Sequence, residues 1–247
     1  MLIQYTSPFV LGVIPARGGS VGVPGKNTLM IAGRPVIHHT LAAAAEARLL
    51  NDLVVSTDSK TIRQVVLEFA DFPVTVVDRP AELAREDSLI QDALWHALQT
   101  YEKGKGHRVD IIVWMSANIP HRKPGLIDSV VRQHLVSGVD SVASVSPVKD
   151  HPLFIKRVSP EGLLIPFLEG GQVYRRQDVE SLFAIDGAAV SIRREVLEAS
   201  VGSTASHAYL GQRIGYVAQE SRYNTELDEP EDLELLEDLI RGAEARS

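Results

Sequence analysis

The chain has 247 residues, of which 45% are hydrophobic and 23% are charged, and it contains no cysteine. This balance is typical of a globular chain with a full hydrophobic core, and the lack of cysteine excludes disulfides, thiolate metal sites and thiol nucleophiles. A formal net charge of −7 argues against nucleic acid or an anionic membrane as partners, so a site for an anionic ligand must gather positive charge locally.

The N-terminal stretch lacks the basic start of a signal peptide, and its apolar run is far too short to span a bilayer. We therefore expect a cytoplasmic protein with no membrane partner.

Strand-like and helix-like segments alternate through the first half of the chain. The short, branched apolar runs at residues 9–14, 52–57, 74–77 and 110–115 predict buried strands. Apolar residues at three-and-four spacing predict helices at residues 35–47, 60–70 and 88–101, with Pro35 in a first turn and Ser88 as an N-cap. This alternation is typical of an α/β fold, with a mostly parallel sheet flanked by helices on both faces.

From about Pro147 the pattern changes to short segments broken by proline and glycine. Alternation in residues 153–158 and 162–168 predicts a β-hairpin that projects from the sheet, within a segment spanning residues 147–185. Its exposed apolar residues predict a subunit contact, and hence a homodimer. Strands at 187–192 and 213–218 follow, and a helix at 229–245, with Pro230 in its acidic first turn, ends the chain.

The stretch "VIPARGGSVGVPGKN", Val13 to Asn27, joins the first strand to the first helix. Ligands of open α/β sheets bind beyond the carboxyl ends of the strands, and glycines let backbone N–H groups approach an anion. Arg17 and Lys26 add the charge that a triphosphate needs. The P-loop and dinucleotide motifs do not match, since Ser20 stands where a P-loop has its first glycine and Asn27 follows the lysine. Spacing alone therefore leaves an ordinary turn and a phosphate cradle equally open.

Several motifs together resemble one family. They are "IPARGGSVGVPGKN" at 14–27, "STDS" at 56–59, "RPAELA" at 79–84, "DHP" at 150–152, "RRQ" at 175–177 and "DGAAVSI" at 186–192. In order and spacing they resemble the acylneuraminate cytidylyltransferases, the CMP-sialic acid synthetases. The resemblance implies one Rossmann-like nucleotide-diphospho-sugar transferase domain over residues 1–247, a homodimer and a requirement for Mg²⁺. It also implies a reaction of CTP with a nonulosonic-type 2-keto sugar acid to give a CMP-sugar and pyrophosphate.

The same resemblance implies roles for individual residues. The nucleotide-binding positions are Arg17, Gly18, Ser20, Lys26, Asn27 and Ser88. The sugar-binding positions are Ser116, Arg176, Gln177 and Asp186. Arg17, Lys26 and Asp228 are the catalytic positions, and Glu226 and Asp228 are the metal ligands.

Some of these assignments have alternatives. Carboxylates one residue apart in an extended segment face the same way and can share one Mg²⁺, but an acidic run is also typical of a solvated surface. Arg175 or Arg176 could serve a dimer contact instead of the sugar. Asp58 either orients the site or caps a turn. The histidines at positions 38, 39, 96 and 121 do not have a metal-binding spacing.

The chain departs from the family pattern at several positions. Val21 replaces a basic residue, Leu89 and Ile90 replace serines that read the base, Ser116 replaces a glutamine, and Asp186 replaces an asparagine. The phosphate loop is thus better preserved than either substrate pocket. Two alternatives therefore remain: the same transfer with another nucleoside triphosphate or sugar acid, or a non-catalytic nucleotide-binding paralogue.

Overall fold

The computed structural model describes residues 7–19, 22–168, 175 and 179–245. A seven-stranded sheet forms the centre, in the order β11-β7-β10-β6-β1-β4-β5. Its strands are β1 (Val10–Pro15), β4 (Asp52–Thr57), β5 (Thr75–Asp78), β6 (Ile111–Trp114), β7 (Ser141–Pro147), β10 (Phe183–Arg193) and β11 (Ile214–Ala218). Only β10 among them runs antiparallel to its neighbours, β6 and β7. The expected mostly parallel sheet is confirmed.

Helices cover both faces of the sheet. They are α1 (Val36–Ala45), α2 (Lys60–Leu67), α3 (Ile90–Lys105), α4 (Leu126–Ser137), α5 (Arg194–Ser200) and α6 (Asp232–Glu244). Side chains of α1, α2 and α4 pack on one face, and side chains of α3 and α5 pack on the other. Successive residues of β1 enter these two cores in turn, which explains why the strand reads as a continuous apolar run.

The predicted strands and helices of the first half are present, but two details of the helix starts are wrong. Leu89, rather than Ser88, precedes the first residue of α3, and the Ser88 hydroxyl donates to the Glu82 carbonyl at 2.9 Å. Pro35 ends β3 and precedes α1 instead of lying in its first turn. Both helices therefore begin without a side-chain cap.

Strand β7 is not predicted from the sequence, because three of its seven residues are serines. Ser141, Ser144 and Ser146 are buried, and each hydroxyl donates a hydrogen bond within the protein. A strand whose polar side chains all find internal partners lacks the apolar run by which buried strands are recognised.

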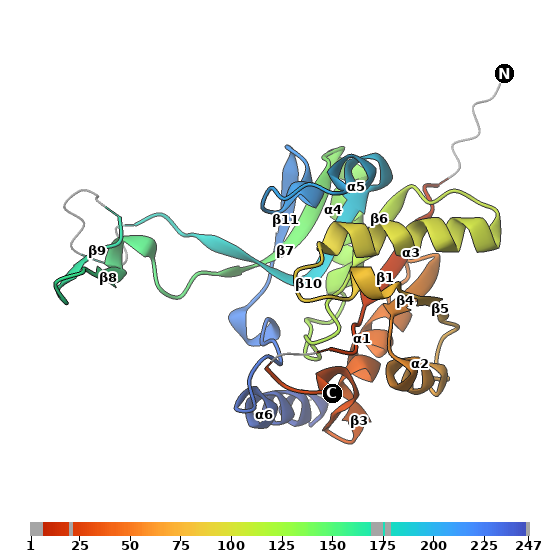
Figure 1. Ribbon diagram of the computed structural model, residues 1–247, viewed down its shortest axis with the longest axis horizontal. Coiled ribbons are helices and arrows are strands. Elements are labelled where there is room, and N and C mark those ends of the chain that lie inside the picture. The colour runs from red at the N-terminus through yellow and green to blue at the C-terminus, as the bar shows by residue number, and fades with distance from the viewer. Residues whose placement is uncertain (1–6, 20–21, 169–174, 176–178, 246–247) are drawn as a thin grey trace.

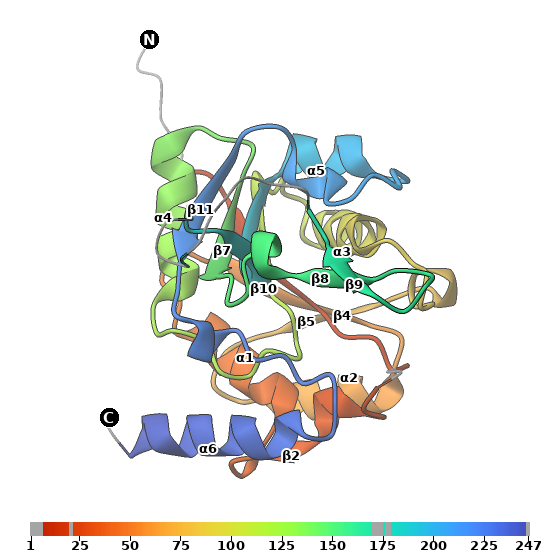
Figure 2. The same ribbon diagram turned by 90° about the vertical axis from the view of Figure 1, so that its left-hand side faces the viewer.

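The predicted hairpin is formed by β8 (Lys156–Val158) and β9 (Leu164–Pro166), which pair antiparallel. Figure 1 shows it far from the sheet, at the end of two long connections that leave from β7 and β10. Figure 2, which looks along these connections, shows the hairpin in front of the body.

The last helix, α6, lies beside a short ribbon formed by β2 (Met30–Ile31) and β3 (Arg34–Pro35), as Figure 2 shows. Pro230 precedes this helix rather than lying in its first turn. The side chains between helix and ribbon form a third hydrophobic cluster, which consists of Val23, Ile31, Val36, Leu227, Leu236 and Ile240. Within the described residues, no helix carries an apolar stretch long enough to cross a bilayer.

Candidate active site

A cavity of about 220 Å³ opens at the carboxyl ends of β1 and β6. The chain runs from β1 to β4 on one side, whereas β6 lies on the other side of β1, so this is the point where the strand order reverses. Such switch points are where open α/β sheets bind ligands. The wall consists of Pro15, Arg17, Lys26, Asn27, Arg79, Leu83, Arg85, Glu86, Ser88, Leu89, Ile90, Ala93, Trp114, Ser116, Ala117 and Asn118.

The wall is strongly positive, although the chain is acidic. Among the described residues that line it, the charged side chains are Arg17, Lys26, Arg79 and Arg85, against a single acid, Glu86. Burial lowers the pKa of Arg79 to about 10, with Asp58 opposing and Arg17 adding to the effect, so Arg79 stays charged at neutral pH. An acidic chain can bind an anion only where positive charge is gathered locally, and this cavity is such a place.

The glycine loop is stabilised by hydrogen bonds within the loop and to Asp58. Gly25 has a φ of +65°, a left-handed conformation that glycine adopts without steric cost, and a short 3₁₀ turn, η1 (Lys26–Thr28), follows it. The buried Asn27 donates from Nδ2 to the Arg17 carbonyl at 3.3 Å, and the Gly18 N–H donates to Asp58 Oδ1 at 2.8 Å. Asp58 thus anchors the glycine loop, and this contact favours the role of orienting the site over that of capping a turn.

The loop touches the acidic segment near the C-terminus through Gly22. A Cβ atom placed on Gly22 would lie 2.1 Å from the Asp228 carbonyl oxygen, so only glycine permits this approach. Val23 and Leu227 join the same hydrophobic cluster directly beside the contact. Segments some 200 residues apart in the sequence are thus fixed against each other.

At this contact the side chains form an ion pair. Lys26 Nζ lies 2.7 Å from Asp228 Oδ1. Asn118 Nδ2 donates to the same oxygen at 3.1 Å and to Glu226 Oε2 at 3.4 Å. The two carboxylates therefore converge on one amide group.

The two acids have different proton affinities. The surrounding protein, and then the charge of Asp228, raise the pKa of Glu226 above its ordinary value. Burial by itself would raise the pKa of Asp228 as well, but the hydrogen bond and charge of Lys26 outweigh it and hold that pKa below its ordinary value.

The donor set suits a hard divalent cation. Both acids keep solvent-exposed surface, both offer carboxylate oxygens, and a cationic side chain already neutralises one of them. In the part of the chain that the structure describes, no third acidic, histidine or cysteine side chain joins this pair to form a metal-binding group.

The predicted sugar side is only partly described. Ser116 lines the cavity, and its N–H donates to the Gly187 carbonyl at 3.2 Å. Ser20, Arg176 and Gln177 lie outside the described residues, as does Val21.

Asp186 is buried beside the cavity and does not contribute to its described wall. Its carboxylate accepts hydrogen bonds from Ser144 and Ser146, from Gln219 Nε2 at 2.8 Å and from the Ala188 N–H at 3.1 Å. These internal donors explain how a carboxylate is tolerated where the family has an amide. The contact of Asp186 with a sugar stays a prediction.

Arg122 is buried beneath the segment that follows β6. It donates to Ala188 O at 2.9 Å, to Thr40 Oγ1 at 2.7 Å, and to the carbonyls of Ser116 and Ile119. Its guanidinium thus fixes the backbone that follows β6.

Four residues of the wall were not predicted as site residues: Arg79, Arg85, Trp114 and Asn118. Arg79 was visible only as part of a matching motif. Asn118 had no signal of its own, because the carboxylates that it contacts lie more than 100 residues further along the chain.

The histidines at positions 38, 39 and 121 each contact other residues of the chain. His38 Nε2 lies 2.7 Å from the Val65 carbonyl oxygen, and His39 Nε2 lies 2.9 Å from that of Ile31. His121 stacks on Tyr223.

Comparison with known families supports the resemblance. A family model described as cytidylyltransferase matches residues 11–246. An N-acylneuraminate cytidylyltransferase from Streptococcus agalactiae serotype V is 34% identical over 201 residues, which cover 80% of this chain and 47% of that protein. The chain thus spans about half the length of this relative. A CMP-N,N'-diacetyllegionaminic acid synthase from Legionella pneumophila is 36% identical over 157 residues, covering 63% of this chain and 66% of that one.

Solved structures share the fold. A CMP:2-keto-3-deoxy-manno-octonic acid synthetase complexed with CTP aligns with a TM-score of 0.72 at 19% identity, over 95% of this chain and 99% of that one. A 4-diphosphocytidyl-2C-methyl-D-erythritol synthase from Anaerococcus prevotii aligns with a TM-score of 0.63 at 11% identity, over 95% and 96% of the two chains. At such low identity these likenesses establish the α/β fold alone.

Proposed function

The chain belongs to the cytidylyltransferase family, and we propose that it transfers the cytidylyl group of CTP to a sialic-acid-like 2-keto sugar acid. In this reaction the anomeric hydroxyl oxygen attacks the α-phosphorus and forms a new P–O bond. The bond to the β-phosphate oxygen breaks, pyrophosphate leaves, and the hydroxyl proton passes to solvent. The names of the curated relatives support a sugar acid of this class.

One observation carries the proposal: the positive cavity and the acid pair meet through the contact of Gly22 with Asp228. Transfer of this kind depends mainly on positioning and on neutralising the phosphates. Arg17 and Lys26 supply positive charge from the loop, and Asn27 holds that loop in shape. Lys26, which pairs with Asp228, would turn to the phosphates of a bound nucleotide.

Glu226 and Asp228 are the residues that would hold Mg²⁺. When bound, the ion supplies further neutralisation of the phosphate oxygens. The protein's part is to keep the two carboxylates side by side at the mouth of the phosphate loop.

The base and the sugar acid are the less constrained parts of the proposal. Leu89 and Ile90 line the cavity where serines would read cytosine in the family, so this wall offers apolar contact in place of hydroxyl groups. Ranking the four nucleoside triphosphates by thermal shift tests the base, because the best ligand stabilises the fold most. A largest shift with CTP supports the proposal, and a larger shift with another triphosphate indicates a different base.

The decisive experiment is a pyrophosphate-release assay with Mg²⁺, the four triphosphates and a panel of nonulosonic acids. We expect turnover with CTP that falls at least 100-fold in Lys26→Ala and Asp228→Ala while both variants stay folded. Nucleotide binding without turnover for any acid would indicate a non-catalytic paralogue instead.

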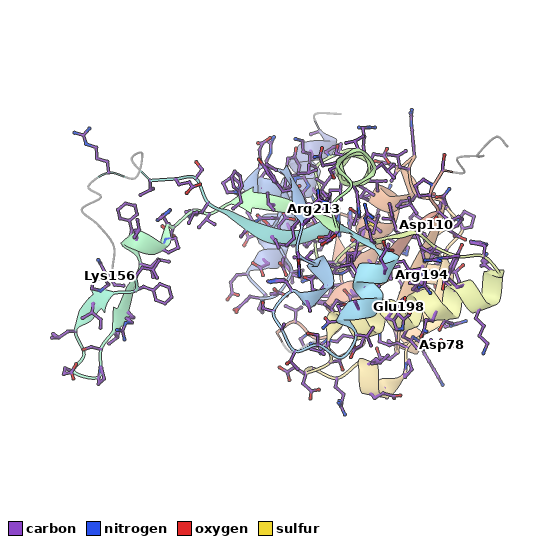
Figure 3. All side chains as sticks on the ribbon, turned by 90° about the horizontal axis from the view of Figure 1, so that it is seen from above. Asp78, Asp110, Lys156, Arg194, Glu198 and Arg213 are labelled. Atoms are coloured by element: carbon purple, nitrogen blue, oxygen red, sulfur yellow. The ribbon has the colours of Figure 1, made fainter. Side chains whose placement is uncertain are left out.

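We also propose that the chain forms a homodimer through the hairpin and the adjoining sheet edge. Leu164 and Phe167 on the hairpin are 73% and 55% exposed, and Phe183 and Tyr216 stack on the edge of the body with 47% and 63% exposure. Figure 3, in which Lys156 marks the hairpin, shows the hairpin and its side chains standing away from the body. Exposed apolar side chains on both the hairpin and the sheet edge favour a second copy of the chain as their partner.

Sedimentation velocity tests the dimer. Phe167→Glu and Tyr216→Glu should yield monomers, because a charge in the contact is strongly unfavourable. Leu67→Glu on α2, which is 63% exposed elsewhere, should leave the dimer intact. A monomeric wild-type chain at micromolar concentration would refute this part of the proposal.

A further inference from the structure

The acid pair is held by two donors of different character. Lys26 reaches Asp228 from the phosphate loop with a long, flexible side chain that carries a full charge. Asn118 reaches both acids from the loop after β6 with a short, neutral amide. Only the amide spans the pair.

Asn118 is also attached to the acid segment through its backbone. Its carbonyl oxygen accepts a hydrogen bond of 2.8 Å from the N–H of Leu227, the residue between the two acids. Leu227 is fully buried in the third hydrophobic cluster. This bond fixes the backbone of Asn118 directly beside the segment that carries the two carboxylates.

Two neighbouring carboxylates repel each other, and they must nevertheless present their oxygens to the same ion. Lys26 relieves the repulsion where it pairs with Asp228, but the proposed reaction requires its charge at the phosphates. A neutral donor has the advantage that it orients the carboxylates without competing with a cation for their charge.

We propose that Asn118 is the positioning residue of the acid pair: its amide keeps Glu226 and Asp228 converged for a divalent cation when Lys26 leaves them. This inference rests on the proposed function. It assigns Asn118 to the orientation of the metal ligands and leaves contact with the substrate to other residues.

The test is calorimetric titration of the full chain with Mn²⁺, alone and with a non-hydrolysable CTP analogue. Loss of a residue that orients metal ligands weakens metal affinity about 10- to 100-fold. We expect Asn118→Ala to lower Mn²⁺ affinity by about tenfold or more, with kcat falling further than KM rises. Asn224→Ala, which removes a partly buried amide from the same stretch of chain, is the matched control and should bind Mn²⁺ like the wild type.

Asn118→Asp separates a positioning role from a merely structural one. In the absence of a cation, a third carboxylate in place of the amide should lower the melting temperature of the variant. Mg²⁺ should then raise the melting temperature of the variant by more than it raises that of the wild type. If Asn118 were purely structural, the melting temperature would fall, but Mg²⁺ would raise it by no more than in the wild type. This variant also decides the question if Asn118→Ala fails to fold.

The outcomes separate the inference from the proposed function. Mn²⁺ affinity within twofold of the wild type in Asn118→Ala, or a wild-type chain that binds no Mn²⁺ with or without the analogue, overturns the inference. Weakened Mn²⁺ binding in Asn118→Ala supports it even if no sugar acid is turned over, in which case only the proposed reaction fails.

Discussion

Gly22 shows how a single atom can determine whether two parts of a site meet. Its missing Cβ lets the loop backbone rest against Asp228, whereas a Cβ at Gly19 would meet nothing within 4 Å. Gly22→Ala must therefore push the loop away from the acid segment. Because a misplacement of about 1 Å costs on the order of 100-fold in rate, we expect kcat/KM to fall by about that factor.

Gly104→Ala on α3, where an added Cβ also meets nothing within 4 Å, is the control for this prediction, and it should keep activity within a few-fold of the wild type. Melting temperatures of both variants show whether the fold survives. Full activity in a folded Gly22→Ala variant would contradict the claim that the contact between loop and acid segment matters.

Asp186 makes a second prediction at the residue scale. Four donors surround its carboxylate, and an asparagine would turn an NH₂ group toward some of them. Asp186→Asn should therefore destabilise the chain by about 1–3 kcal/mol, although it restores the residue that the family pattern contains. Chemical denaturation measures the change, with the exposed Asp71→Asn as control. A more stable Asp186→Asn variant would show that the internal donors do not favour a carboxylate.

At the scale of elements, α6 has a role that its terminal place in the chain conceals. Its buried Leu236 packs with Val23 of the phosphate loop and Leu227 of the acid segment, in a cluster separate from the two sheet cores. This small core is what holds loop and acids together. Removing part of it should loosen the site before it unfolds the sheet.

Leu236→Ala tests this directly. A buried leucine truncated to alanine costs about 2–5 kcal/mol, here confined to a small cluster. We expect faster hydrogen exchange in residues 226–245 and lower activity, with sheet protection retained. Leu235→Ala, at a position 51% exposed on the same helix, should change neither. Uniform loss of protection across the sheet would mean that the cluster is not a separate unit.

The elements that the sequence predicts well are those whose residues all face apolar surroundings. β1 and β4 have buried residues on both faces, so their apolar runs are continuous. β7 was missed because its buried serines are satisfied by partners distant in sequence. The helix start at Ser88 was wrong because that hydroxyl bonds to Glu82 instead of capping α3.

The site likewise contains parts that the sequence predicts and parts that it does not. Arg17, Lys26 and Asn27 lie in one short motif, and the acid pair in another, so each could be recognised alone. What joins them could not, because the approach of Gly22 to Asp228 and the amide of Asn118 depend on how distant segments pack. Local patterns predict the parts of a site, and tertiary contacts determine their arrangement.

For the molecule as a whole, charge is distributed unevenly. The chain carries a net −7, yet the described charged wall of the cavity is mainly cationic. Such an arrangement draws an anion to one place on a surface that otherwise repels it.

Global stability should depend on pH through His134, which connects α4 to β10. Its Nδ1 lies 2.7 Å from Ser191 Oγ, and the side chain is 2% exposed. Burial, and then the charge of Arg193, lower the pKa of His134 from 6.5 to about 4. Between these values the unfolded chain binds a proton that the folded chain does not. Stability must therefore fall as pH decreases from about 6.5 to about 4.

The size of this loss is about 3–4 kcal/mol, because one pKa unit corresponds to about 1.4 kcal/mol. His134→Asn removes the titrating group, while its amide can still bond to Ser191. Although the smaller side chain lowers stability at every pH, the slope of unfolding free energy against pH should become shallower in this window. The exposed His207→Asn is the control, since asparagine also tolerates the left-handed backbone at that position. Equal slopes for His134→Asn and the wild type in urea titrations at pH 4–7 would show that His134 is not the group responsible.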